Sequence, residues 1–159
     1  MKLQRNRHLT PVHGLKGENG QAAVEIAFTL PLLLLVVTGI LAFGLTLNNY
    51  MMLTDSVSVA GRQIAISRGN TTDPCATAVT AVTTAAPNLK PSKLSYTLTL
   101  NGTAYTGTSC SSSSTTTGAA GNLVQGSDAT LNVTYPCTLG VYGMHLTCSL
   151  AAQVTEIVQ

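Results

Sequence analysis

The sequence predicts an α+β protein with a long N-terminal helix, a short second helix and an antiparallel sheet of three or four strands. Three observations lead to this fold class. Residues 26–47 form an apolar run without charge, and residues 92–101 and 129–135 alternate apolar and polar side chains. Such alternation is typical of half-buried strands. The third observation is a set of four cysteines after the apolar run: Cys75, Cys110, Cys137 and Cys148.

The apolar run has the length and composition of a transmembrane helix. Its 22 residues would extend about 33 Å as a helix, enough to cross a hydrocarbon core of about 30 Å. A core helix of a soluble protein would carry a polar stripe, and this run has none. We therefore expect residues 26–47 to span a membrane once.

The flanking charges predict the orientation of this span. Four basic residues precede the run and the next one after it is Arg62. Cytoplasmic flanks carry the excess of Lys and Arg. We expect a single-pass protein of the inner (cytoplasmic) membrane, with a cytoplasmic N-terminus and residues 69–159 forming an exported domain.

The even number of cysteines favours two disulfides in an oxidising compartment. Three pairings are possible, and sequence order favours Cys75–Cys110 with Cys137–Cys148. Four reduced thiols are the alternative, which would require a cytosolic domain. No C-x-x-C pair occurs and His145 is the single histidine nearby. Zinc sites usually need closely paired ligands, so we expect no metal.

The long helix is expected to continue beyond the membrane, over residues 21–68 in all. Gly69 and Asn70 supply a stop signal. The apolar residues expected to share one helix face are Met52, Val59, Ala60, Ile64 and Ala65. A second, Ala-rich helix is predicted over residues 74–86, where Pro87 ends it.

The strands follow the second helix. The first alternating segment leads into Asn101–Gly102, which is typical of a type I′ hairpin turn. Residues 111–122 are rich in Ser, Thr and Gly and are expected to form a mobile loop. Residues 129–135 predict a second main strand that Pro136 ends, and a last strand is expected over about 145–157.

The junction before the apolar run carries the main functional hypothesis. A basic leader, residues 1–20, ends at Gly20, and Glu25 is an isolated acid at the edge of the run. A carboxylate near a membrane helix is costly and needs compensation. Cleavage after Gly20 would create an α-amine on Gln21, about one helical turn from Glu25. An uncleaved signal anchor is the alternative.

This junction resembles that of type IV prepilins, in which a peptidase cuts after a glycine and leaves a glutamate at mature position five. The chain departs from that pattern because its mature form would begin with Gln21 rather than Phe or Met. Gln21 could be free, methylated or cyclised, and cyclisation would remove the amine that is expected to meet Glu25.

The closer resemblance is to the TadE-like pseudopilins of the tight-adherence (Flp) pilus system. It rests on the stretch from Gly20 to Gly69, with its A-V-E core at Ala23–Glu25, and on the C-terminal NVTYPC and LTCSLAAQVTEIV. It implies a pilin-like fold and a minor pseudopilin that primes, enters or caps a pilus used in adhesion or secretion. The implied partners are a prepilin peptidase, other pilins or pseudopilins, the inner-membrane assembly platform and membrane lipid.

Other function classes find little support in the sequence. Outside the leader, four basic residues face five acidic ones, so no basic stripe for nucleic acid exists. No phosphate-binding loop, nucleophile elbow or carboxylate pair occurs. We expect no enzyme activity, catalytic residue, cofactor or small-molecule substrate. The alternative function is a single-pass anchored binding protein that never polymerises.

Overall fold

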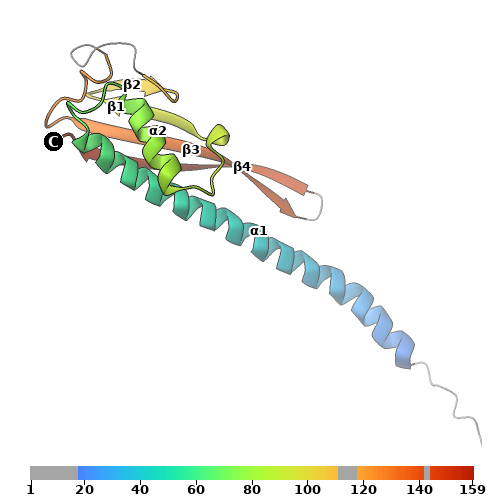
Figure 1. The fold of residues 1–159 in the computed structure, drawn as a ribbon. Helices are drawn as coiled ribbons and strands as arrows, with labels where there is room; N and C mark the ends of the chain where they lie inside the picture. The colour runs from blue at the N-terminus through green and yellow to red at the C-terminus, as the bar shows by residue number, and fades with distance from the viewer. Residues whose placement is uncertain (1–17, 111–117, 142–143) are drawn as a thin grey trace, which may run out of the picture. The chain divides into compact units, whose positions relative to one another are not determined.

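The computed structural model describes residues 18–110, 118–141 and 144–159, which form two helices, one short 3-10 helix and one four-stranded sheet (Figure 1). The predicted α+β class is confirmed. The elements in chain order are α1 (Glu18–Ile66), α2 (Pro74–Ala85), η1 (Pro91–Lys93), β1 (Ser95–Leu100), β2 (Thr103–Thr106), β3 (Asp128–Val141) and β4 (Met144–Ile157). The chain divides into two compact units between Val37 and Thr38.

Helix α1 is continuous over 49 residues, with Pro31 inside it, which confirms the predicted long helix. It ends where Ser67 turns back: the Ser67 amide and hydroxyl both donate to the Ile64 carbonyl, at 3.0 and 2.8 Å. Gly69 then adopts a φ of 76°, a left-handed conformation that glycine accepts without steric cost. The predicted stop at Gly69 is therefore confirmed to within three residues.

Helix α2 and the first hairpin also follow the local sequence signals. Asp73 caps α2 and Pro74 occupies its first turn, where proline loses no hydrogen bond. Between β1 and β2, Asn101 and Gly102 have φ values of 47° and 80°. Two consecutive positive φ values are those of a type I′ turn, as the sequence predicts.

The sheet is antiparallel in the order β2-β1-β3-β4. The prediction that Pro136 ends the second main strand is wrong, because β3 continues to Val141. Pairing of β3 with β1 stops at Thr134, whereas pairing with β4 continues through Pro136 to Val141. Proline lacks an amide proton and is tolerated in a strand whose other edge needs no partner.

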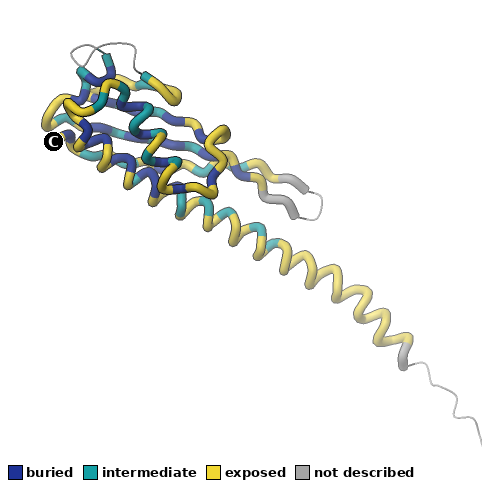
Figure 2. The backbone as a smooth tube through the Cα atoms, viewed as in Figure 1, coloured by how far each residue is buried: buried dark blue, intermediate teal, exposed yellow. Residues whose placement is uncertain are grey.

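The core lies between the sheet and the two helices (Figure 2). Helix α1 contributes a stripe at helical spacing: Leu53, Val57, Ala60 and Ile64, none more than 1% exposed. The predicted face was correct for Ala60, Ile64 and Ala65 but wrong for Val59, which is 53% exposed. Met52 is partly buried, and the prediction missed the buried residues Leu53 and Val57.

Between β2 and β3, residues 107–110 and 118–127 are described, and residues 111–117 of the predicted mobile loop lie outside the described residues. In the remainder, Ala119, Ala120 and Leu123 are buried. The Asn122 side-chain amide donates to the Tyr105 hydroxyl at 2.6 Å, and Arg68 Nε donates to the Leu123 carbonyl at 3.1 Å. These contacts attach the segment to β2 and to the chain just after α1.

Candidate assembly site on the N-terminal helix

The apolar surface of α1 is exposed over its first half. Every residue from Gly20 to Thr38 is exposed, and Phe28 reaches 78%. By length and composition the helix could cross a membrane: its most apolar stretch has a mean hydropathy of 2.6 and is not buried in the protein. So large an exposed apolar surface is favourable only in contact with lipid or with other apolar helices. The helix is thus a candidate membrane anchor.

Gly20, Gln21 and Glu25 all lie in the first two turns of α1, which begins at Glu18. Gly20 and Gln21 are both exposed, so the bond between them lies at the surface of the helix. The remainder of the predicted leader, residues 1–17, lies outside the described residues.

Glu25 lies on the same face of the helix as Gln21, because residues four positions apart are about one turn apart. Its side chain is exposed, and no described residue forms an ion pair or hydrogen bond with its carboxylate. The Thr29 hydroxyl donates to the Glu25 backbone carbonyl at 2.9 Å, which leaves the carboxylate charge untouched. Among the residues whose side chains the structure describes, Glu25 thus carries a negative charge without a partner at the edge of the apolar run.

The four cysteines form two disulfides, in the pairing that sequence order favours. Cys75–Cys110 links the start of α2 to the segment after β2. Cys137–Cys148 links residues that lie directly opposite each other in β3 and β4. Both bonds lie in the unit that follows residue 37 and stabilise its small core by restricting the unfolded chain.

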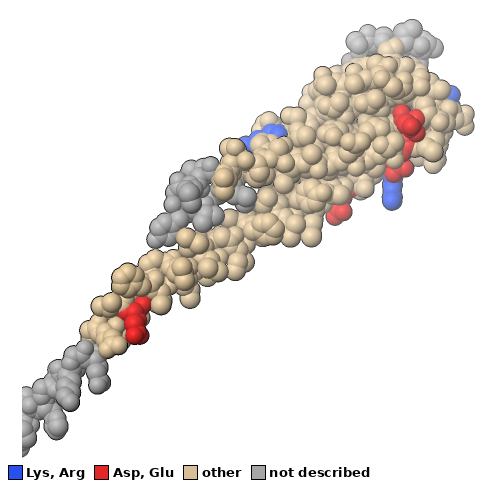
Figure 3. Space-filling model, turned by 180° about the vertical axis from the view of Figure 1, so that it is seen from behind, with Lys and Arg blue, Asp and Glu red and all other residues tan. Residues whose placement is uncertain are grey.

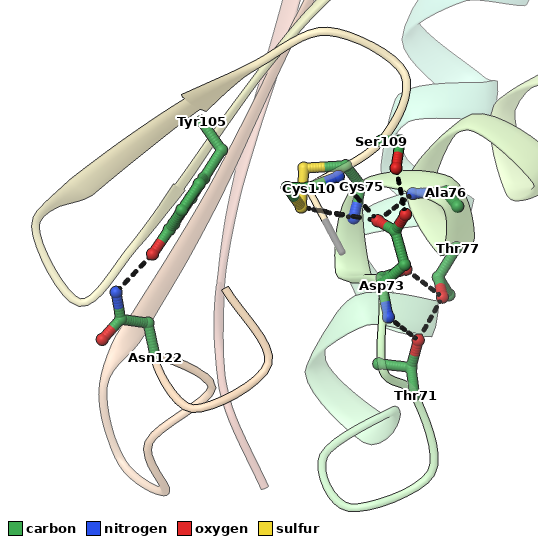
Figure 4. The surroundings of a disulfide bond; sticks show 9 residues. All are labelled: Thr71, Asp73, Cys75, Ala76, Thr77, Tyr105, Ser109, Cys110 and Asn122. Carbon is green, nitrogen blue, oxygen red and sulfur yellow. Dashed lines mark hydrogen bonds between the residues drawn. A yellow bond between two sulfur atoms is a disulfide. The ribbon is translucent and has the colours of Figure 1, made fainter. Parts of the chain in front are cut away.

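Asp73 organises the surroundings of the Cys75–Cys110 disulfide (Figure 4). One of its oxygens accepts from the amides of Ala76 and Cys110, at 2.9 and 3.0 Å, and the other accepts from the Ser109 hydroxyl at 2.6 Å. Partial burial on its own raises the pKa of Asp73, but these hydrogen bonds outweigh burial and hold the pKa below its usual value. The charged carboxylate thus fastens α2 to the segment after β2.

Three of these residues carry the atom types that bind metal ions. Ligand atoms of Asp73, Cys75 and Cys110 lie within 4.8 Å of one another. Both sulfurs are consumed in the disulfide, and metal-binding cysteines must be free thiolates. Asp73 alone is left, with its oxygens already occupied by hydrogen bonds. This group of residues is a structural cap.

Gly61 was not singled out by the sequence analysis, yet it fixes how closely α1 approaches the sheet. A Cβ atom at Gly61 would lie 2.5 Å from Val154 Cγ1, a separation that side chains cannot tolerate. The backbone of α1 therefore packs directly on β4 at this point. The adjacent small residues Ala60 and Gly61 were the available signal, since such a pair inside a helix often marks a close approach.

An open groove of about 760 Å³ runs between α1 and α2. Exposed Val59 lines it, which explains why this valine does not join the core. The other lining residues are mostly threonines and alanines, and Asp73 is the single charged one among them. Three hydrogen bonds already hold the Asp73 carboxylate in place as the cap of α2.

These features define the class of protein: an α+β protein with a long apolar N-terminal helix, a candidate membrane anchor, and a disulfide-bonded unit after it. Residues 20–62 match the family described as TadE-like protein, so the chain carries a TadE-like segment. The match begins at Gly20, includes Glu25 and ends one residue after Gly61. It indicates a protein associated with the tight-adherence pilus. No curated protein and no solved structure matches the chain.

Proposed function

We propose that the chain is a minor pseudopilin that takes part in assembling a tight-adherence type IV pilus. The observation that carries the proposal is the isolated Glu25 carboxylate on the exposed apolar helix of the TadE-like segment. An apolar helix needs no such charge to anchor a protein, and the charge is costly near lipid. A partner that neutralises it explains its presence.

In this proposal a prepilin peptidase removes residues 1–20 on the cytoplasmic side and frees the Gln21 α-amine. Before assembly this amine compensates Glu25 of the same chain, one turn away. During assembly Glu25 meets the amine of a neighbouring pilin or pseudopilin and sets the stagger between their helices. The role is structural and needs no catalytic residue, cofactor or small-molecule substrate.

The surface of the described residues agrees with a structural role. Few charged side chains are seen on the face shown in Figure 3, and Lys and Arg do not gather there. Nucleic-acid binding draws its affinity from clustered basic residues. Partners are therefore expected to be recognised through the apolar helix and the disulfide-bonded unit rather than through a charged patch.

The first test is intact mass and N-terminal sequencing of the protein from the membrane or fibre fraction of cells that produce it. A chain beginning at Gln21, whether free, methylated or cyclised, supports the proposal. A chain that retains Lys2 would support the alternative, a single-pass anchored binding protein that is not polymerised.

The second test is the variant Glu25→Ala with Ile26→Ala as its matched control. We expect both variants to be cleaved, and Glu25→Ala to reduce assembled pili by about tenfold, as loss of an ion pair worth about 1.4 kcal/mol would do. Electron microscopy and sheared-fibre yield measure this. Normal pilus formation by Glu25→Ala would contradict the proposed role.

A further inference from the structure

The β3–β4 hairpin extends beyond the rest of the sheet. Pairing between β1 and β3 ends at Ser95–Thr134, whereas β3 and β4 continue as a two-stranded ribbon to Val141–Met144. We call residues 135–141 and 144–150 the distal ribbon (Figure 1). The Cys137–Cys148 disulfide lies inside it. Two-stranded ribbons are marginally stable alone, so this disulfide holds the ribbon together.

The distal ribbon lies beside the outer end of the apolar run of α1. Near the start of β3, the Gln159 amide donates to the Ala65 carbonyl at 3.0 Å, and Asp128 pairs with Ile157. At the other end, Tyr135 to Thr138 line one groove with Ala42 and Thr46. Strand β3 therefore runs antiparallel to α1, and its ribbon end reaches residues of the 26–47 run.

Backbone dimensions agree with this placement. From Asp128 to Thr138 a strand extends about 33 Å, and from Ala65 to Ala42 a helix extends about 35 Å. Strand β3 continues from Thr138 to Val141, which adds about 10 Å in the same direction. The ribbon therefore lies beside the outer turns of the apolar run, where Gly39, Ala42 and Thr46 are partly buried. The exposed stretch of residues 20–38, about 28 Å of helix, is left to cross the hydrocarbon core.

The chemistry of this region fits a membrane surface. Leu146 is 63% exposed, and no Asp, Glu, Lys or Arg occurs from residue 129 to 155. A long exposed edge strand usually carries charges that prevent it from pairing with another chain in water, and the distal ribbon carries none. Exposed Lys93 lines the same groove as Tyr135, and Tyr50 of α1 is 43% exposed just beyond the apolar run. Tyrosine and lysine are favoured at the level of lipid headgroups.

We propose that the distal ribbon is a second membrane contact, which rests in the lipid interface on the outer face of the membrane. Leu146 enters the boundary between headgroups and acyl chains, and Lys93 faces the lipid phosphates. The unpaired outer edges of the ribbon keep it out of the hydrocarbon core, where unsatisfied backbone groups are too costly. The inference rests on the proposed membrane anchoring of α1 but not on leader cleavage or pilus assembly.

The chain contains no tryptophan, so one introduced indole reports its own surroundings. We would place it in the full chain at Leu146, at Ile157 as the matched control, or at Phe43 within the apolar run. Leu146 and Ile157 lie on the same strand and are 63% and 62% exposed, so both substitutions are equally tolerable. Each variant would be inserted into vesicles of phosphatidylcholine and phosphatidylglycerol whose acyl chains carry bromine near the carbonyl.

We expect bromine to quench Phe43→Trp strongly, and Leu146→Trp at least threefold more than Ile157→Trp. Thr138→Trp, on the partner strand, repeats the test if Leu146→Trp folds poorly. Equal quenching at 146 and 157, with Phe43→Trp quenched, overturns the ribbon contact and leaves the anchor intact. A blue shift at 146 without quenching indicates a protein partner and also overturns it. An unquenched Phe43→Trp removes the anchor and with it this inference.

Discussion

At the scale of single residues, Gly61 has the sharpest steric requirement. Replacing Gly61 by Ala places a methyl group 2.5 Å from Val154 Cγ1, so α1 must move away from β4. Overpacking of this kind costs about 1–3 kcal/mol. We expect Gly61→Ala to lower the unfolding free energy by that amount, measured by denaturant titration in detergent.

Gly39 and Gly44 are matched controls in the same helix, because no atom lies within 4 Å of a Cβ built at either position. Alanine at these sites should be neutral or stabilising, since glycine is a poor helix former. Equal destabilisation at positions 39 and 61 would show that the close approach to Val154 is not the cause.

Two tyrosines make a second residue-scale comparison. The Tyr96 hydroxyl is buried without a hydrogen-bond partner among the described residues, and burial raises the pKa of Tyr96. The Tyr105 hydroxyl instead accepts from Asn122. Removing an unsatisfied hydroxyl is nearly neutral, whereas losing a made hydrogen bond costs about 0.5–1.5 kcal/mol. Tyr96→Phe should leave the melting temperature unchanged or raise it, and Tyr105→Phe should lower it.

Asp73 predicts how stability depends on pH. Its folded-state pKa lies below the unfolded value, because three donors stabilise the carboxylate against the opposing effect of burial. The stabilisation is fully present above the unfolded pKa and is lost as pH falls through the folded pKa. When the pH is lowered from 7 to 3, the melting temperature of the wild type should therefore fall further than that of Asp73→Asn. Parallel pH profiles of the two proteins would refute this.

At the scale of elements, the two disulfides should differ in their effect on stability. Cys75–Cys110 closes a separation of 35 residues and Cys137–Cys148 one of 11. From loop-closure entropy, we expect Cys75–Cys110 to add about 4 kcal/mol to the unfolding free energy and Cys137–Cys148 to add about 3 kcal/mol. Replacing Cys75 and Cys110 by serine should lower the unfolding free energy by about 1 kcal/mol more than replacing the other pair, as chemical denaturation would show. The reverse order would indicate that the distal ribbon depends on its disulfide for more than chain entropy.

Elements defined by local signals could be predicted from the sequence. The apolar run, the Asp73–Pro74 start and the Asn101–Gly102 turn each fix their element within a few neighbouring residues. The length of β3 could not be predicted in this way, because Pro136 is acceptable only where β1 has already ended. Which residues of α1 face the core likewise depended on the placement of α2, whose groove takes Val59.

At the scale of the whole molecule, the role of the candidate assembly site stays a prediction, and the structure adds the setting of its residues. Gly20, Gln21 and Glu25 lie together on the first turns of α1, as the helical spacing required. The contact between Gly61 and Val154 joins segments far apart in the sequence. The small pair Ala60–Gly61 indicates a close approach, but no local pattern predicts which strand makes it. The distal ribbon escaped prediction for the same reason, since its placement beside α1 follows from the register of β3 with β4.

The contact between α1 and β4 also has a consequence for the order of biogenesis. Strand β4 is the last of the described strands in chain order, and Val158 after it is buried in the core. If residues beyond about 50 are carried across the membrane, the core-facing stripe of α1 emerges first and waits uncovered until the final strand arrives. Contacts of such long sequence separation form slowly. With that orientation, the exported chain would be open to proteolysis, to incorrect disulfide pairing and to capture by chaperones until β4 has crossed the membrane.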